Sequence, residues 1–134
     1  MNITADTNVL VRALVGDDPT QAAEASRVMR DASTIAIPLP VLCELVWVLK
    51  RVYGFAVADI AAAIRSLLVA GNVQLDRQAV EAGLALLEAS GDFADGVIAH
   101  QGQWLGGDVF VSFDRKAVAL LRGQGVGTLL LDAA

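Results

Sequence analysis

The sequence predicts an α/β fold, and three features lead to this prediction. Short apolar runs rich in β-branched residues alternate with longer segments that have helical periodicity. Helix-capping residues and glycines stand at the junctions between them. No internal repeat, low-complexity tract or long linker interrupts the pattern, so residues 1–134 are expected to form a single domain. Alternation of this kind indicates helices packed on a mostly parallel sheet.

The first half of the chain begins with the stretch "NITAD", which predicts a short strand that leads directly into a helix starting at Thr7. A second helix is expected after residue 18, because Asp18 suits the N-cap, Pro19 the first helical position and Gln21 the third. The further elements predicted here are a strand at 34–37, a helix from about Pro40 to Tyr53 ended by Gly54, and a helix at 57–70.

The second half repeats the alternation of strands and helices. Asp76 is a candidate cap for a helix, and the stretch "DVFVSFD" is the clearest strand in the chain. The elements predicted here are a strand at 73–75, helices at 77–89 and 93–105, the strand within 108–114, a short helix at 115–125 and a last strand within 127–134.

Composition narrows the class of protein. Hydrophobic residues make up 55% of the 134 positions, which favours self-association or a partner that covers apolar surface. The longest apolar stretch, "LPVLCELVWVL", is too short to span a bilayer and contains Glu44. No secretory signal is visible, and the single Cys43 offers neither a disulfide framework nor a zinc site. These features fit a protein of the reducing cytoplasm, with no membrane association.

The formal net charge of −5 argues against a general nucleic-acid binder held by electrostatic attraction alone. It leaves room for an enzyme whose acidic side chains hold cations. The single histidine, His100, excludes nuclease chemistry that needs a pair of histidines.

Four acidic residues occupy positions that are hard to explain by a structural role alone. Asp6 and Asp114 follow predicted strands, where ligands bind in parallel sheets. Glu44 lies inside an apolar helix, and an unpaired buried carboxylate is costly. Asp95 lies one turn after Asp92 in "GDFADGVIAH". If several of these carboxylates meet, their repulsion requires a cation, and hard oxygen ligands favour Mg²⁺ or Mn²⁺.

Each acid also has a structural explanation. Asp6, Asp92 and Asp114 are plausible helix N-caps, and for Asp92 the capping role is favoured. Glu44 would pair with Lys50 or Arg51, or lie on a narrow solvent-facing edge of its helix. Because three strand-to-helix junctions and one apolar helix all supply an acid, the functional interpretation gains weight over four separate structural ones.

The stretches "ADTNVLVRAL", "PLPVLCELVWVLKRVYG", "GDFADGVIAH" and "VFVSFDRKAV" together resemble the successive motifs of PIN-domain ribonucleases. They are particularly similar to the VapC toxins of bacterial toxin–antitoxin pairs, and the similarity runs in order over essentially the whole chain. The resemblance implies a PIN-like three-layer α/β/α fold with a short, mostly parallel central sheet.

The resemblance also implies a set of site residues. Asp6, Glu44, Asp95 and Asp114 would be the catalytic and metal-binding acids, with Thr7, Asn8, Asp92 and Ser112 as neighbouring polar residues around the ligands. Relatives usually have Ala or a similar residue at the position of Gly96, and often Thr at that of Ser112; neither difference removes a ligand. Basic residues near the acids in sequence are expected to contact RNA phosphates: Arg12, Lys50, Arg51, Arg115 and Lys116.

The function implied by the resemblance is Mg²⁺-dependent hydrolysis of RNA phosphodiester bonds, with Mn²⁺ as a substitute. The ion would acidify a water molecule and polarise the phosphate. Such a toxin is inhibited by a VapB-type antitoxin, is expected to be a homodimer, and acts in the bacterial cytoplasm.

Two alternatives remain open. A phosphatase of the haloacid dehalogenase class has an Asp-x-Asp-x-Thr strand end, but here Asn8 replaces the second Asp and no Thr follows. A non-catalytic interaction module with the PIN fold would bind a partner without cleaving anything, although the presence of all four acids weighs against it.

Overall fold

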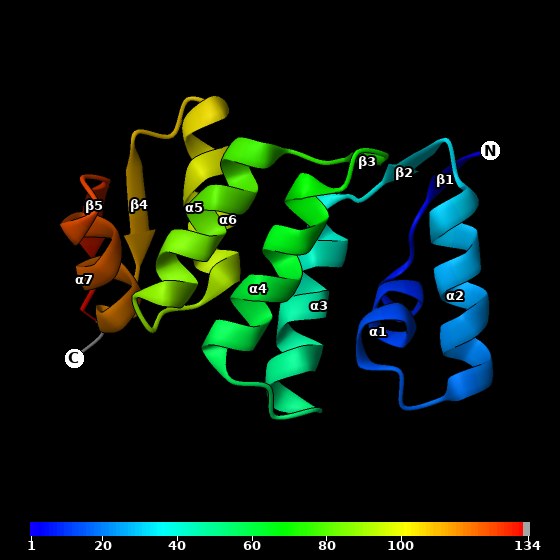
Figure 1. Cartoon of the computed structure of the whole chain (residues 1–134). Helices are drawn as coiled ribbons and strands as arrows, with labels where there is room; N and C mark the ends of the chain where they lie inside the picture. The colour runs from blue at the N-terminus through cyan, green and yellow to red at the C-terminus, as the bar shows by residue number, and fades with distance from the viewer. Residues whose placement is uncertain (133–134) are drawn as a thin grey trace. The chain divides into compact units, whose positions relative to one another are not determined.

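The computed structural model describes residues 1–132 and consists of two compact units, Met1–Asp76 and a second unit that begins at Arg77 (Figure 1). Each unit combines helices with short parallel strands, so the predicted α/β class is confirmed. The units are described one at a time below. The expectation of a single domain over residues 1–134 stays a prediction.

The first unit contains a three-stranded parallel sheet in the order β1-β2-β3. Asn2 on β1 is in register with Thr34 on β2, and Ile35 on β2 with Val73 on β3. The elements of this unit are β1 (Asn2–Thr4), α1 (Thr7–Val15), α2 (Pro19–Asp31), β2 (Thr34–Ala36), α3 (Leu39–Arg51), α4 (Val57–Val69) and β3 (Val73–Gln74).

The core of the first unit lies between the sheet and its helices. Helix α1 packs on both α2 and α3, and α3 packs on α4. Ile35, on the central strand, is almost completely buried. The helices contribute one apolar stripe each, and the fully buried side chains of these stripes are Leu10, Leu42, Leu45, Leu49, Ile60 and Ile64. Residues spaced three and four apart in the sequence form these stripes, as expected for helices with one buried face.

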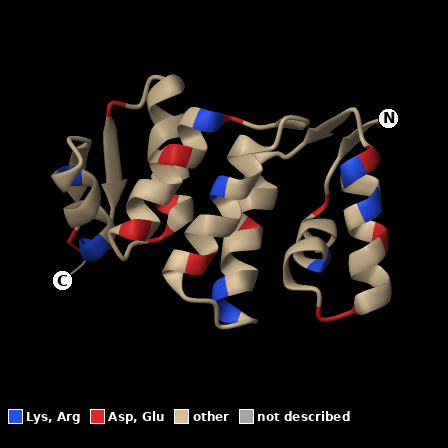
Figure 2. Ribbon diagram, in the orientation of Figure 1, with Lys and Arg blue, Asp and Glu red and all other residues tan. Residues whose placement is uncertain are grey.

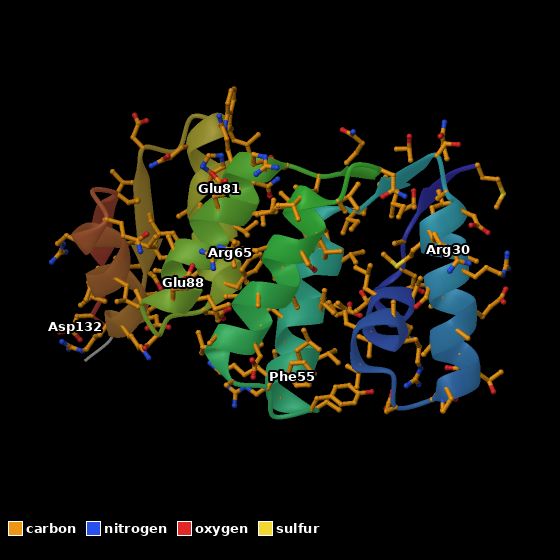
Figure 3. All side chains as sticks on the ribbon, viewed as in Figure 1. Arg30, Phe55, Arg65, Glu81, Glu88 and Asp132 are labelled. Carbon is orange, nitrogen blue, oxygen red and sulfur yellow. The ribbon has the colours of Figure 1, made fainter. Side chains whose placement is uncertain are left out.

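Helix α2 shows how local sequence fixes an element. The Asp18 side chain accepts a hydrogen bond of 3.1 Å from the backbone N–H of Gln21, and Pro19 occupies the first helical turn. The predicted cap is therefore confirmed. Farther along, the ribbon of α2 carries both acidic and basic positions (Figure 2). Arg27 is paired to Glu24. Arg30, near the end of the helix (Figure 3), lies 3.4 Å from the carboxylate of Asp31.

The second unit contains two parallel strands and three helices among its described residues. Val109 on β4 is in register with Gly127 on β5, and Ser112 with Leu130. The elements of this unit are α5 (Arg77–Glu88), α6 (Phe93–Trp104), β4 (Val109–Ser112), α7 (Arg115–Gly123) and β5 (Gly127–Leu130). Helix α7 packs on both strands, and its core residue Leu121 clusters with Leu86 and Ala99.

Helices α5 and α6 approach each other closely because glycines line their contact. A Cβ atom added at Gly96 would lie 2.4 Å from the carbonyl oxygen of Ala82. At Gly83 an added Cβ would lie 2.7 Å from the ring of Phe93, which is itself buried. Any side chain at position 96 would therefore push the two helices apart.

Most predicted elements match the structure within a few residues. The helix expected over 40–53 is α3, which ends at Arg51, and Gly54 follows in a left-handed conformation with φ 68°. The last strand, expected within 127–134, is formed by Gly127–Leu130, and positions 133 and 134 lie outside the described residues. No helix in residues 1–132 is both long enough and apolar enough to cross a membrane.

Candidate functional site

Asp6 occupies the junction between β1 and α1. Its backbone is extended, with φ −78° and ψ 156°, and its carbonyl oxygen accepts a hydrogen bond from the N–H of Val9. Asp6 is thus the N-cap residue by position, but its side chain makes no capping hydrogen bond. The carboxylate is exposed. Capping therefore does not account for the acid at this position, and its oxygens remain available to a ligand.

The two polar residues after Asp6 have different environments. Thr7 is buried, with only 4% of its surface exposed, whereas Asn8 is exposed. The hydrophobic face of α1, formed by Leu10 and Val11, explains why the helix lies against the unit with Thr7 turned inward. Asn8 is therefore the neighbour of Asp6 that solvent and a ligand can reach.

The exposure of Glu44 differs from one expectation based on the sequence. It was expected to lie buried among apolar neighbours, but it is exposed. The buried face of α3 is formed by Leu42, Leu45 and Leu49, and position 44 points away from this face. Within residues 1–132, Glu44 makes no ion pair with Lys50 or Arg51, so the solvent-facing alternative is the one found.

Asp92 and Asp95 both belong to the first turn of α6, with different roles. The Asp92 carboxylate accepts a hydrogen bond of 3.0 Å from the backbone N–H of Ala94, which confirms the predicted N-cap. Asp95 accepts no such bond from any residue within 1–132, and it is partly buried. Burial raises the pKa of Asp95, and the nearby carboxylates of Asp92 and Asp114 raise it further.

Asp114 is held at the start of α7 by two hydrogen bonds. Its carboxylate accepts a bond of 3.0 Å from the N–H of Ala117, which confirms its capping role. Its own backbone N–H donates to the hydroxyl oxygen of Ser112, also at 3.0 Å. Ser112, at the end of β4, therefore fixes the turn that presents Asp114. A threonine would keep the same acceptor oxygen.

The second unit thus brings Asp92, Asp95 and Asp114 near enough to influence one another electrostatically. All three offer oxygen atoms, which is the donor set that Mg²⁺ and Mn²⁺ prefer. Within residues 1–132, however, no group of three or more His, Cys, Asp or Glu side chains is arranged to hold a metal ion. In Asp92 and Asp114, one carboxylate oxygen is also engaged in a helix-capping hydrogen bond. The chemistry of the donors fits a hard cation, whereas a complete ligand shell is not formed.

The basic residues expected to contact RNA fall into two groups. Among the described residues, four of them are exposed and make no ion pair with a carboxylate: Lys50, Arg51, Arg115 and Lys116. The fifth, Arg12, is paired with Asp17, and the Nη1 to Oδ1 distance is 3.1 Å. The charges of these four side chains are not compensated by a carboxylate, which suits contact with phosphate groups.

Two residues around Arg12, Asp17 and Tyr53, were not predicted from the sequence. Asp17 accepts the Arg12 bond through one oxygen and a bond of 3.0 Å from the Tyr53 hydroxyl through the other. The Tyr53 bond, followed by the Arg12 charge, holds the pKa of Asp17 below its ordinary value. Because Tyr53 lies 36 residues from Asp17, no local pattern signals the contact.

The family model of the PIN domain matches residues 3–121 of the chain. The chain belongs to the PIN domain family. The match includes all four acids of the candidate site, namely Asp6, Glu44, Asp95 and Asp114. PIN domains have an α/β fold and are generally metal-dependent nucleases, so the predicted fold class and family are confirmed. A search of curated proteins gave no match.

Proposed function

We propose that this PIN domain is a Mg²⁺-dependent endoribonuclease toxin of the VapC type, which hydrolyses RNA phosphodiester bonds and is inhibited by a VapB-type antitoxin. The observation that carries the proposal is the PIN match over residues 3–121. Within it stand the four acids in the order of the motifs that resemble VapC toxins. The haloacid dehalogenase alternative gains no support from this family match.

Asp6, Glu44, Asp95 and Asp114 are proposed as the metal-binding and catalytic residues. The electrostatics of the second unit support this role, because Asp95 is partly buried beside two further carboxylates. A divalent cation would relieve that repulsion and keep Asp95 ionised. When bound, Mg²⁺ lowers the pKa of a water nucleophile and offsets the negative charge of the phosphate, and Mn²⁺ supplies the same chemistry.

The remaining polar residues are proposed to position these acids. Ser112 accepts the hydrogen bond that fixes the backbone of Asp114, and Asp92 caps the helix that carries Asp95. Asn8 is exposed one residue beyond Thr7, where its amide is proposed to orient a ligand or the attacking water. Thr7 is buried, so its contribution is to anchor the start of α1.

RNA binding by a protein of net charge −5 requires local positive charge. Lys50 and Arg51 supply it at the end of α3, and Arg115 and Lys116 in the first turn of α7. The first turn of a helix disfavours cations because of the helix dipole, so the pair on α7 is not explained by helix stability. Phosphate contacts are the proposed reason for these residues.

The test of catalysis is RNA cleavage by the purified chain, free of antitoxin. With Mg²⁺, the wild type is expected to cut a mixture of cellular RNAs, and a chelator is expected to abolish cutting. Asp95→Asn should lose at least about 100-fold in rate, since a ligand charge is removed from the reaction centre. Asp59→Asn is the matched control, because Asp59 is exposed on α4 and lies outside the proposed site. Equal activity of Asp95→Asn and wild type would contradict the proposal and favour the non-catalytic module.

The toxin role is tested in living cells. Induced expression of the wild type in a bacterial host is expected to arrest growth, and co-expression of the product of a short reading frame directly upstream is expected to restore it. Exposed apolar side chains of the second unit, among them Trp104, Leu105 and Phe113, support a protein partner or a homodimer. Growth unaffected by the active nuclease would contradict the toxin role alone.

A further inference from the structure

Arg12, Asp17 and Tyr53 form a hydrogen-bonded network that joins three separate segments of the first unit. Arg12 lies on α1, Asp17 in the turn after it, and Tyr53 just beyond the end of α3. Both oxygens of the Asp17 carboxylate are engaged, one by the Arg12 guanidinium at 3.1 Å and the other by the Tyr53 hydroxyl at 3.0 Å. The carboxylate therefore has a fixed orientation and in turn orients Arg12.

The partners of Asp17 are themselves fixed. The Tyr53 ring meets the ring of Phe55 edge-to-face, with 6.4 Å between the centroids. Phe55 is labelled in Figure 3. Gly16, with φ 70°, reverses the chain at the end of α1 so that Asp17 lies beside Arg12. Tyr53 is therefore held by its own neighbour, and the turn that carries Asp17 is set by a left-handed glycine.

The network leaves most of the Arg12 guanidinium unused. Arginine has five N–H donors, and the contact with Asp17 uses one nitrogen. The side chain is 33% exposed. Arg12 follows Asn8 by four residues on α1, so the two lie on the same face, about one helical turn apart. Asp6 lies at the start of the same helix, so Arg12 stands one to two turns from the acid that begins it.

Stability is a weak explanation for the network. Exposed ion pairs contribute little to folding, and this one has both charged side chains at least one-third exposed. The charges of Arg12 and Asp17 also cancel at long range, so Arg12 does not attract RNA as an isolated cation does. What the network supplies is a guanidinium that Asp17 contacts through Nη1 alone, on a side chain that is still 33% exposed. Its remaining N–H donors match the geometry of a phosphate group.

We propose that Asp17 and Tyr53 are positioning residues that orient Arg12 to bind the RNA phosphate adjacent to the one cleaved. The inference rests on the proposed ribonuclease function and adds to it a substrate contact with its supporting residues. It predicts a specific effect for Tyr53→Phe, which removes one hydroxyl group without changing any charge.

The test is a double-mutant cycle read as KM and kcat on a fluorescently labelled single-stranded RNA of mixed sequence. Arg12→Gln is expected to raise KM about 10-fold with kcat nearly unchanged, because a charged hydrogen bond to the substrate is lost. Tyr53→Phe is expected to raise KM roughly 3-fold in the wild type. In the Arg12→Gln background the same change should have no effect, since Tyr53 acts only through Arg12.

Arg27→Gln is the charge-matched control, because Arg27 lies on α2 and pairs with Glu24 and Asp31. Arg12→Lys keeps the charge but loses the planar fork, so its KM should fall between those of the wild type and Arg12→Gln. Melting temperatures of all variants establish that each is folded. The inference is overturned if Arg12→Gln matches Arg27→Gln, or if the Tyr53→Phe effect persists without Arg12.

The same cycle in RNA dissociation constants, measured by fluorescence anisotropy, separates this inference from the proposed function. Wild type that binds without cleaving would contradict catalysis while the cycle still decides the role of Tyr53. If the wild type cleaves RNA and Arg12→Gln has the same dissociation constant as the wild type, only the positioning inference is contradicted. Wild type that neither binds nor cleaves RNA would overturn both.

Discussion

Asp95 is the residue whose environment most clearly departs from that of a surface carboxylate. Its pKa is raised by burial first and then by the charges of Asp92 and Asp114. A carboxyl group with a raised pKa in the folded state binds more protons there than in the unfolded chain. Folding stability therefore falls as the pH rises from about 4 through the raised pKa of Asp95.

Asp95→Asn is accordingly expected to stabilise the metal-free protein at neutral pH, because it removes an ionised group from an unfavourable site. The gain should disappear at a pH below about 4, where Asp95 is protonated in both folded and unfolded chains. Melting temperatures of wild type and variant across this pH range provide the measurement. A variant that is less stable than wild type at pH 7 would show that the Asp95 charge is favourable in the fold.

A divalent cation is expected to act in the same direction as that substitution. Mg²⁺ that binds only the folded chain should raise the melting temperature of the wild type in a concentration-dependent manner. The increase should be much smaller in Asp95→Asn and unchanged in Asp59→Asn. An identical shift in all three proteins would indicate an ionic-strength effect and no specific site.

Individual site residues also differ in how far the sequence predicts their contacts and exposure. The caps at Asp92 and Asp114 were predictable because a cap depends on a few adjacent residues. The exposure of Glu44 could not be decided, because the apolar residues on both sides of it, "VLC" and "LVWVL", concealed which face of α3 is buried. The Asp17–Tyr53 contact was missed because tertiary packing alone creates it.

At the scale of elements, the pairing of α5 and α6 depends on the absence of a side chain at position 96. The backbone carbonyl of Ala82 occupies the space that a Cβ atom would take. The resemblance to PIN-domain ribonucleases implied only that alanine or a similar residue is usual at this position. The structure supplies the physical reason for glycine in this chain, which is the close approach of two helix backbones.

Gly96→Ala is therefore expected to destabilise the protein by about 2 kcal/mol, in spite of the higher helix propensity of alanine. Gly102→Ala, on the same helix, has nothing within 4 Å of the added Cβ atom. That control should be neutral or stabilising by up to about 1 kcal/mol. Urea denaturation of both variants measures the difference, and equal midpoints would refute the close approach of the helices.

Helix α6 also depends on its N-cap residue, Asp92. Asp92→Ala removes the acceptor for the Ala94 N–H and should cost about 1 kcal/mol, whereas Asp92→Ser should recover most of the loss. The comparison is made by urea denaturation at pH 7. If Asp92→Ala were as stable as the wild type, the relief of repulsion between Asp92 and Asp95 would outweigh the loss of the cap.

For the whole molecule, the local sequence predicted nearly every helix and strand but not how the strands group. Cap residues and apolar periodicity predicted the start of α2 and the bounds of α4 and α6 to within a residue or two. Strands of two to four residues carry too little sequence information to specify their partners. The described strands form a three-stranded and a two-stranded parallel sheet, an arrangement that only the structure provides.

The distribution of charge over the whole chain predicts a salt-dependent affinity for RNA. If Lys50, Arg51, Arg115 and Lys116 each neutralise one phosphate, log K should fall with log salt with a slope of about −3. Replacing Lys50 and Arg51 by glutamine should reduce the slope by about 1.4. The paired arginines Arg27 and Arg30 serve as controls, since their charges are already compensated. An unchanged slope in the Lys50 and Arg51 variant would remove both residues from the RNA interface.

The cap at Asp114 has a consequence for the choice between the two acidic amino acids. The carboxylate reaches the Ala117 N–H at 3.0 Å across the short aspartate side chain, while the Asp114 backbone is held by Ser112. A glutamate would preserve the charge but carry its head group one methylene farther out, beyond the geometry of an N-cap. Asp114→Glu is therefore expected to lose the cap, at a cost of about 1 kcal/mol, although it keeps the charge. Asp114→Ser loses the charge but keeps a capping oxygen. Directed-evolution libraries selected for folding alone should therefore deplete glutamate at position 114 more than serine.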